Sequence, residues 1–347
     1  MVHGQSPWPN VAREVGLLFL GLAALSAVLV RAMISVGALD VPVDRSSHTV
    51  PTPKGGGVGI VAAYAIGTVW SLHGVGGLFE VPILGAVLVL AWVSYIDDVH
   101  GWPLAAKLAA QLGAGVVAMA CGHVVRSLAV PGVVAIPLGY VGPALTLGWI
   151  LFVTNAVNFI DGLNGLAGGC TLVGCVLAVA ASPHSLGYQA GALAAGVAGF
   201  LPFNYPRARI FMGDVGSQVC GFLLANFAVL AAGSAQASLV VPLALLPILA
   251  DVAVTLARRA WQGARLTQPH RGHLYQVAQR AGLGAAWVSA LYWALSAWGG
   301  SCGLLAGRFG TGSPWVVPIA CAAAAAPFMP WALFVQRKAK QAGITAW

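Results

Sequence analysis

The chain carries the sequence NFIDGLNGLAG at residues 158–168, between one apolar run at about 142–157 and another at about 170–181. One carboxylate, two asparagines and three glycines are unsuited to a helix that faces lipid, where backbone polar groups must be satisfied internally. Glycine also lets the backbone approach a ligand closely. The segment is therefore either an irregular turn between two membrane spans or a binding site at a membrane–water boundary.

The composition decides the class of protein around this segment. Of 347 residues, 59% are hydrophobic and only 7% are charged, whereas about a quarter are charged in a soluble globular protein. The apolar runs are long and unbroken rather than alternating, which favours helices over a membrane barrel. We expect an all-α polytopic integral membrane protein. The net charge of +8 follows the expected loops and indicates no nucleic-acid partner, and six Cys without CxxC indicate no disulfide or zinc framework.

The hydropathy pattern predicts about eleven transmembrane helices, or ten, in a single catalytic domain over residues 1–347. The first run is long for a signal peptide and is expected to be a retained helix. The expected spans lie at about 15–36, 57–73, 78–96, 103–121, 142–157, 169–182, 187–203, 215–233, 237–257, 284–306 and 314–335.

The loop charges predict the orientation. With the first loop in the cytoplasm, all Lys and Arg of the loops fall inside except Arg13, Arg126 and Arg308. This asymmetry places the N-terminus outside and the C-terminus inside. The segments 38–56, 97–102, 158–168, 204–214 and 258–283 then share the cytoplasmic face and form the expected active-site face. On the other side, residues 122–141 are expected to form a small hairpin.

Carboxylates stand at the ends of several spans on this face. Asp97 and Asp98 are adjacent, and Asp214 lies near the start of the eighth span. Paired carboxylates at a membrane surface require a cation, and Mg²⁺ prefers one or two carboxylates together with phosphate oxygens and water. The alternatives are a solvated helix end at Asp97-Asp98, a general base in one of these two residues, and a helix N-cap at Asp214.

Basic side chains accompany the carboxylates. Arg45, His48 and Lys54 precede Gly55–Gly57 and suit an anionic group, although they also suit a positive-inside anchor, and the glycines also suit tight helix packing. Lys107, one turn into the fourth span, either extends to the membrane surface or reaches a phosphate.

The largest inside loop contains two histidines, His270 and His273. Without a cysteine or carboxylate nearby, they fit phosphate contact better than zinc. Asp251, near the inner end of the ninth span, could pair with Arg258 or face the site. Together these clusters favour metal-assisted chemistry on phosphates, with at least one substrate in the bilayer.

The order of these motifs resembles the polyprenyl-phosphate N-acetylhexosamine-1-phosphate transferases, the membrane superfamily of the glycosyltransferase family 4 type. The opening loop and the histidine loop look most like the O-antigen-initiating branch. The motifs are Asp97-Asp98, Asn155-x-x-Asn158-x-x-Asp161-Gly-Leu, Phe211-Met-Gly-Asp214-Val-Gly-Ser217 and His270-Arg-Gly-His273.

The resemblance implies an enzyme of the bacterial inner membrane. It would transfer an N-acetylhexosamine 1-phosphate from a UDP-sugar to undecaprenyl phosphate, release UMP and begin a cell-surface polysaccharide. Mg²⁺ would be required, with Mn²⁺ as a substitute ion. The implied partners are the two substrates and the lipid bilayer, with no nucleic acid, and a homodimer is left open.

The resemblance also implies roles for residues. Asp97, Asp98 and Asp214 would act on the metal and lipid phosphate, with Asp161, His270 and His273 as further catalytic residues. The substrate-binding set would comprise Arg45, His48, Lys54, Lys107, Asn155, Asn158, Gly162, Leu163, Asn164, Asn204, Phe211 and Arg271, with Phe211 stacked on uracil.

Two departures from the family pattern matter. Asn164 replaces an acid found in many members, and the histidine loop has two histidines rather than the three-histidine run of the lipid I enzyme, which argues against a UDP-MurNAc-pentapeptide donor. The main alternative is a transporter or flippase of an anionic lipid-linked substrate. A transporter needs ionisable groups near the midplane, whereas these groups gather at one face. A CDP-alcohol phosphatidyltransferase is disfavoured because its DxxDG…GxxxDxxxD run is absent.

Overall fold

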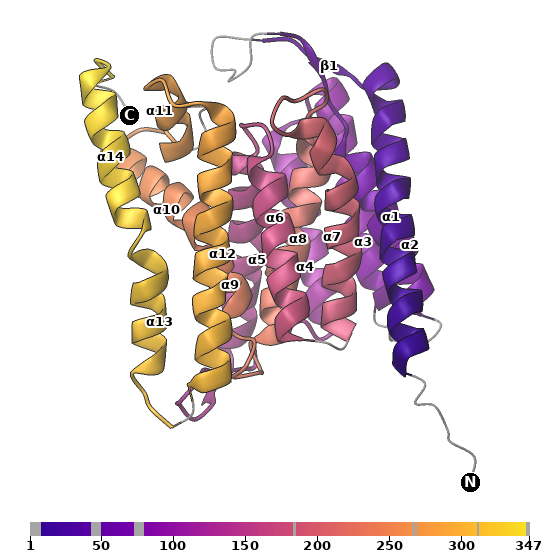
Figure 1. Cartoon of the computed structure of the whole chain (residues 1–347), viewed down its shortest axis with the longest axis vertical. Helices are drawn as coiled ribbons and strands as arrows, with labels where there is room; N and C mark the ends of the chain where they lie inside the picture. Colours follow the sequence, from indigo (N-terminus) through magenta and orange to yellow (C-terminus); the bar gives the residue numbers. More distant parts are fainter. Residues whose placement is uncertain are drawn as a thin grey trace.

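A computed structural model describes residues 8–42, 50–72, 80–182, 185–265, 268, 270–310 and 312–344. It is a bundle of helices that run along one long axis (Figure 1). The helices are α1 (Trp8–Val36), α2 (Gly57–Ser71), α3 (Glu80–His100), α4 (Leu104–Ala120), α5 (Val141–Ile160), α6 (Leu166–Ala181), α7 (Ser185–Asn204), α8 (Gly213–Ala231), α9 (Val240–Ala244), α10 (Leu246–Trp261), α11 (Leu274–Arg280), α12 (Ala285–Phe309), α13 (Val316–Ala325) and α14 (Phe328–Gln341).

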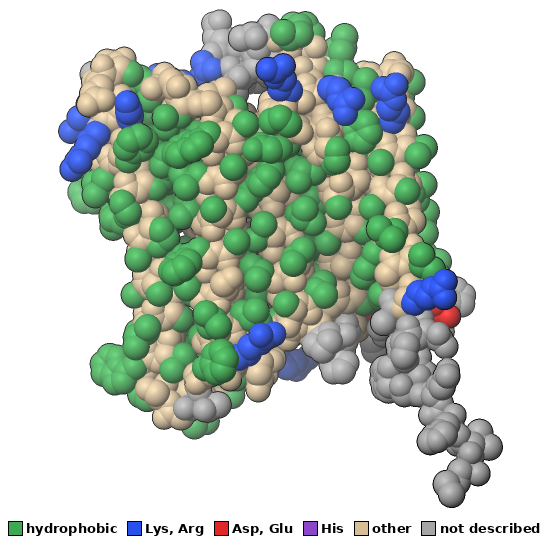
Figure 2. Space-filling view, viewed as in Figure 1, with side chains coloured by type: hydrophobic (Ala, Val, Ile, Leu, Met, Phe, Trp, Pro, Cys, Tyr) green, Lys and Arg blue, Asp and Glu red, His purple; other side chains and the backbone are tan. Residues whose placement is uncertain are grey.

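Several helices have the length and the apolar composition of membrane spans. Six segments of the described chain are long and apolar enough to cross a membrane: Arg13–Val36, Glu80–His100, Val141–Ile160, Ser185–Asn204, Gly213–Ala231 and Val316–Gln341. Figure 2 shows apolar side chains over the middle of the bundle and Lys and Arg side chains toward its two ends. This is the pattern of a polytopic membrane protein. The number of spans and their orientation stay predictions.

Two of the expected spans are interrupted. The run 237–257 is divided between α9 and α10, and the run 314–335 between α13 and α14. Pro247 is in the first turn of α10, and Pro327 directly precedes α14. Proline has no backbone N–H and its ring clashes with the preceding turn, so a continuous helix is broken at such positions.

Helix α8 is the centre of the bundle. Most of its residues are buried, and it packs on α3 and α5. The backbones of α8 and α2 also lie directly against each other. A Cβ added to Gly57 would overlap with the backbone amide of Gly216. The glycines after Lys54 therefore serve close helix packing, one of the two interpretations of this loop.

Two short hairpins cap the bundle. β1 (Leu39–Asp40) pairs with β2 (Thr52–Pro53), and β3 (Ser127–Leu128) pairs with β4 (Ile136–Pro137). The second pairing confirms the expected hairpin within 122–141.

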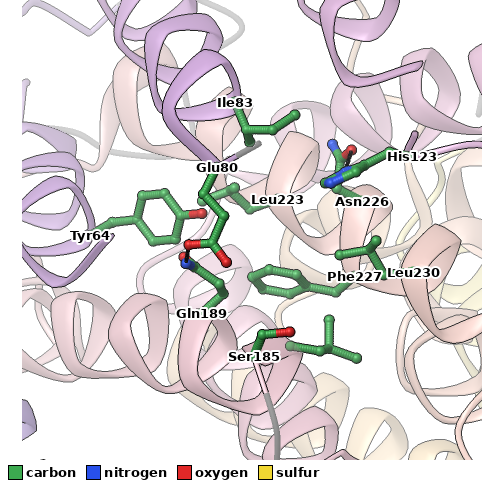
Figure 3. A pocket seen from close by; sticks show the side chains of 11 residues that line it. Tyr64, Glu80, Ile83, His123, Ser185, Gln189, Leu223, Asn226, Phe227 and Leu230 are labelled. Atoms are coloured by element: carbon green, nitrogen blue, oxygen red, sulfur yellow. Dashed lines mark hydrogen bonds between the residues drawn. The ribbon is translucent and has the colours of Figure 1, made fainter. Parts of the chain in front are cut away.

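A separate polar network lies at the start of α3, away from the motifs. The Glu80 carboxylate accepts hydrogen bonds from Ser71 Oγ at 3.1 Å and from Gln189 Nε2. Figure 3 shows Glu80 beside Gln189. Nearby, the His123 ring contacts Asn226 Oδ1 at 2.9 Å. Glu80 therefore makes polar contacts within the fold at the opposite end of α3 from Asp97 and Asp98.

Candidate active site

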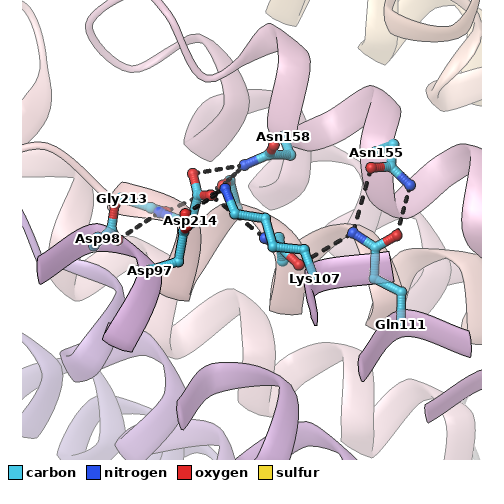
Figure 4. A network of polar contacts seen from close by, with 10 residues as sticks. Asp97, Asp98, Lys107, Gln111, Asn155, Asn158, Gly213 and Asp214 are labelled. Carbon is cyan, nitrogen blue, oxygen red and sulfur yellow. Dashed lines mark hydrogen bonds and ion pairs between the residues drawn. The ribbon is translucent and has the colours of Figure 1, made fainter. Parts of the chain in front are cut away.

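Three of the predicted carboxylates meet around one lysine (Figure 4). Asp97 and Asp98 occupy the last turn of α3, and Asp214 is the second residue of α8. Lys107 Nζ from α4 pairs with Asp97 Oδ2 and lies 2.5 Å from Asp214 Oδ2. The Asp214 amide donates a hydrogen bond to Asp98 Oδ2 at 2.8 Å. We call Asp97, Asp98, Lys107 and Asp214 the carboxylate cluster.

Amide side chains hold Asp214 from the other side. Asn158 Nδ2 donates to Asp214 Oδ1 at 3.0 Å and to Ser217 Oγ at 2.9 Å, and Gln218 Nε2 lies 3.4 Å from Asp214 Oδ2. Charge-assisted hydrogen bonds of this kind fix a carboxylate in one orientation. Asp214 therefore has a defined position before any substrate binds.

A second amide pair extends this network along α4 and α5. Asn155 Nδ2 donates to Gln111 Oε1 at 2.7 Å, and Gln111 Nε2 donates to Gln218 Oε1 at 3.2 Å. Gln111 lies one turn after Lys107 in α4, and through Gln218 it connects Asn155 to Asp214 of the carboxylate cluster.

Gly213 sets the approach between α3 and α8. Its φ of +74° lies in the left-handed region, where residues with a Cβ are strained. A Cβ at this position would also lie 2.6 Å from Asp98 Oδ2. Glycine is therefore required here both by the backbone turn and by the closeness of the Asp98 carboxylate.

Asp161 adds a further acid beside the cluster. It directly follows α5, and burial, followed by the nearby Asp214 and Asp98 carboxylates, raises its pKa well above the ordinary value. Lys54 acts in the opposite direction on this pKa, and its Nζ lies 3.3 Å from Asp40 Oδ1. The excess of negative charge makes this region attractive to a cation.

A pocket of about 390 Å³ is lined by the segments that follow α5 and precede α8. Four residues predicted to bind the nucleotide share it, namely Gly162, Leu163, Asn164 and Phe211. The Phe211 backbone is held in place because its amide donates to Pro53 O at 2.8 Å and its carbonyl accepts from Gly56 at 2.9 Å. We call this cavity the Phe211 pocket. Its wall is completed by Val50, Thr52, Arg207, Ala208, Gln279 and Ala285.

An apolar groove of about 600 Å³ lies among α4, α5 and α10. Most of its wall is aliphatic or aromatic, and one part carries His270, His273, Gln276 and Asn155. We call it the His270 groove. Its apolar lining is Leu104, Leu108, Leu151, Phe152, Phe159, Val252 and Leu256.

The two histidines sit together, with ring centroids 4.9 Å apart. Burial, followed by His273, Arg259 and Arg258, lowers the pKa of His270 to about 4. His270 is therefore neutral near pH 7, so its ring can form hydrogen bonds there without carrying a positive charge.

The remaining predicted residues are placed differently. Arg45 and His48 lie in 43–49, outside the described residues. Asn204 is buried, and its side chain accepts a hydrogen bond from the Gly165 amide at 2.5 Å and donates to Ile210 O at 2.9 Å. These bonds connect it to two loop backbones, and its role in substrate binding stays a prediction. Arg271 is partly exposed in the histidine loop.

Sequence reasoning gave no role to several residues that the structure brings to the site. Gln218 follows one turn after Asp214, Arg207 lines the Phe211 pocket, and Tyr275 donates from its hydroxyl to Phe159 O at 2.9 Å. Gln218 was recognisable from its i+4 spacing to Asp214. Arg207 and Tyr275 had no comparable signal.

The donor set at the cluster fits a hard divalent cation. Its side chains offer carboxylate and amide oxygens, and Lys107 shows that a positive charge is accommodated between Asp97 and Asp214. Across the described part of the chain, no group of three or more His, Cys, Asp or Glu residues is arranged to hold an ion. Such an ion would therefore depend on substrate phosphates for its remaining ligands, as Mg²⁺ commonly does.

Comparison with known proteins places the chain in a family. The sequence profile described as glycosyl transferase family 4 matches residues 81–232. A decaprenyl-phosphate N-acetylglucosaminephosphotransferase of Mycobacterium tuberculosis is 32% identical over 76% of this chain and 75% of its own length. The chain belongs to glycosyl transferase family 4. The matched segment of this family 4 protein contains all four acids of the site, but not the histidine loop.

Other relatives have related names. A probable undecaprenyl-phosphate N-acetylglucosaminyl 1-phosphate transferase of Bacillus subtilis is 27% identical over 76% of each chain. A phospho-N-acetylmuramoyl-pentapeptide-transferase of a Synechococcus species is 34% identical over 64% of this chain and 69% of its own. These are transferases of phosphate-linked groups, and the family 4 chain is a phosphotransferase.

Proposed function

We propose that this phosphotransferase transfers N-acetylglucosamine 1-phosphate from UDP-N-acetylglucosamine to undecaprenyl phosphate and releases UMP. The observation that carries the proposal is the end of α5. Asn155 and Phe159 line the apolar groove, Gly162 and Leu163 line the polar pocket, and Asn158 between them bonds to Asp214. The end of α5 thus contributes to a cavity suited to an apolar chain and to a cavity suited to a polar ligand, and between them it bonds to the carboxylate cluster.

The Phe211 pocket suits the nucleotide sugar. Phe211 offers an aromatic face for a base, and Arg207 offers a charge for a phosphate. The relatives of Mycobacterium tuberculosis and Bacillus subtilis are named for N-acetylglucosamine, which supports this hexosamine over others.

The His270 groove suits the lipid phosphate. Its aliphatic wall matches an isoprenoid chain, and the histidines and Asn155 offer hydrogen bonds to a phosphate at the polar part. The same relatives are named for decaprenyl or undecaprenyl phosphate acceptors.

The reaction follows from this arrangement. An oxygen of the lipid phosphate attacks the sugar-bearing phosphorus of the nucleotide sugar, a new P–O bond forms, and the bond to the bridging oxygen breaks so that UMP leaves. Lys107 offsets negative charge near Asp97 and Asp214, and either Asp97 or Asp98 accepts a proton if the lipid phosphate enters protonated. A bound Mg²⁺, or Mn²⁺ in its place, would neutralise phosphate oxygens, held by Asp214 with Asp97 or Asp98.

The location is part of the proposal. The asymmetry of Lys and Arg supports an active site at the cytoplasmic face of the bacterial inner membrane, where a nucleotide sugar is available. The loop motifs support a place at the first membrane step of an O-antigen-like polysaccharide.

The test measures UMP release by the purified protein in detergent. UDP-N-acetylglucosamine, UDP-N-acetylgalactosamine and UDP-MurNAc-pentapeptide are compared, each with and without undecaprenyl phosphate and with Mg²⁺, Mn²⁺ or EDTA. Release that requires UDP-N-acetylglucosamine, lipid and metal together supports the proposal. No release with any donor by folded protein would contradict it and favour the transport alternative, which is then tested by flux across proteoliposomes.

A further inference from the structure

Asp251 is a buried carboxylate that the proposed reaction does not use. It lies in α10 with its side chain fully buried, and several nearby groups donate hydrogen bonds to it. Oδ1 accepts the Leu274 amide at 2.7 Å, and Oδ2 accepts the Tyr275 amide at 3.1 Å and the Tyr292 hydroxyl at 2.6 Å. The sequence left open a pair with Arg258 or a position facing the site, and the carboxylate instead binds the first turn of α11.

One face of α10 holds the histidine loop. Asp251, Thr255 and Arg258 follow at i, i+4 and i+7, which places them on the same side of a helix. Thr255 Oγ1 lies 3.5 Å from Gly272 O, and Arg258 Nη2 donates to the same carbonyl at 2.9 Å. The backbone between the two histidines is therefore bound to the helix that also carries Asp251.

These contacts determine where the histidine rings lie. His273 is the N-cap of α11, directly before the two amides that Asp251 accepts, and its Nδ1 is 3.5 Å from Asp251 Oδ1. A carboxylate beside the first amides of a helix is favourable because those amides have no partner within the helix. Without this carboxylate, the start of α11 loses the contacts that fix His273 in the groove wall.

The start of α11 also reaches the other cavity. The Tyr275 hydroxyl bonds to Phe159 O, and a Cβ on Gly162 would overlap with that hydroxyl. Gly162 lines the Phe211 pocket, and Phe159 lines the groove. The first turn of α11, which Asp251 holds, therefore touches residues 159–162, the segment between the Phe211 pocket and the His270 groove.

We propose that Asp251 is a positioning residue that holds the first turn of α11 and thereby fixes the His270–His273 pair at the polar part of the groove. This inference rests on the proposed function, because that function assigns the two histidines to the lipid phosphate. Asp251 contacts no substrate in this scheme and acts through the loop.

A double-mutant cycle tests the proposal. Asp251→Asn keeps the size of the side chain but lowers its capacity to accept hydrogen bonds, and we expect kcat to fall about 10- to 100-fold, the cost of a small displacement of a catalytic group. In a His270→Ala, His273→Ala background the same change should lower kcat less than about threefold, because coupled residues are not additive. An equal loss in both backgrounds would overturn the proposal, since it would show a role independent of the histidines.

Hydrogen exchange gives a readout without turnover. In Asp251→Asn, the amides of Leu274 and Tyr275 should exchange at least about tenfold faster, while α8 keeps its protection. Hydrogen exchange can be measured even if no UMP is released, so failure of the proposed function and failure of this inference are distinguishable. Hydrogen exchange also tests the role of Asp251 if the histidine variants turn over too slowly to assay. Unchanged exchange in the first turn of α11 would overturn the proposal.

Two further variants complete the experiment. Glu80→Gln is the matched control, because it makes the same acid-to-amide change at the separate polar network of Figure 3, and it should leave the exchange of α11 unchanged. If Asp251→Asn does not fold, Tyr292→Phe removes only one donor to the carboxylate. It should raise α11 exchange by a smaller factor, and no rise would contradict the proposal.

Discussion

Replacing Gly213 with alanine should disable the carboxylate cluster while preserving the fold. The left-handed φ of +74° costs a residue with a Cβ about 1–2 kcal/mol. The added Cβ at 2.6 Å from Asp98 Oδ2 also displaces this carboxylate from the Asp214 amide, a charge-assisted hydrogen bond worth about 1.5–3 kcal/mol. The total loss of stability is then about 2.5–5 kcal/mol. Because Asp98 leaves its position, kcat for UMP release should fall at least about 100-fold.

Two alanine controls separate these causes. Gly343 has a φ of +69° with no atom near an added Cβ, so Gly343→Ala reports the backbone strain alone. Gly85 lies in helix α3 with open space around it, so Gly85→Ala should be neutral or stabilising by up to about 1 kcal/mol. Both should keep full activity. The reasoning is refuted if Gly213→Ala turns over like the parent and melts at the same temperature as Gly343→Ala.

Three other variants test separate parts of the site. Asp214→Asn should abolish turnover while the protein stays folded in detergent, and near-parental activity would remove its metal role. Phe211→Ala should raise KM for the nucleotide sugar about tenfold, consistent with about 1–3 kcal/mol per stacked base, with KM for the lipid unchanged; an effect on lipid KM alone would contradict the pocket assignment. The pKa of His270 is about 4 in the folded protein, whereas its ordinary value is 6.5. Between these pH values the unfolded chain binds more protons than the folded protein, so the free energy of unfolding falls as the pH is lowered through this window. His270→Gln should show a shallower fall in melting temperature from pH 6.5 to 4, and equal slopes would count against the lowered pKa.

The helical membrane fold was predictable because its cause lies in composition. Long apolar runs have few alternatives to helices in lipid, and the expected ranges of α1 to α8 overlap the helices observed. The breaks at α9–α10 and α13–α14 were missed although Pro247 and Pro327 marked them, because hydropathy alone does not register a missing N–H.

The site was predictable where residues carry unusual chemistry for a membrane. Asp97, Asp98, Lys107, Asn158 and Asp214 are costly in lipid, so their grouping at span ends was informative, and the structure joins them in one network. Their roles in catalysis stay predictions.

Other placements depend on contacts that sequence does not show. Asn204 has the same chemistry as Asn158, yet its bonds to Gly165 and Ile210 turn it into the loops. Asp251 is likewise indistinguishable in sequence from an acid that faces the site, and only the path of the chain after α10 brings the α11 amides to it.

The pairing of residues 53–57 with residues 211–212 has a consequence for biosynthesis. Pro53 and Gly57 are translated long before Phe211 and Met212, to which they bond, and the histidine loop follows later still. A nascent chain therefore cannot complete the Phe211 pocket until Gln279 and Ala285 are made, and the His270 groove lacks part of its wall until α10 and the two histidines are made. The enzyme should gain activity only after residues up to Ala285 have been made, so a chain that stalls earlier consumes no nucleotide sugar.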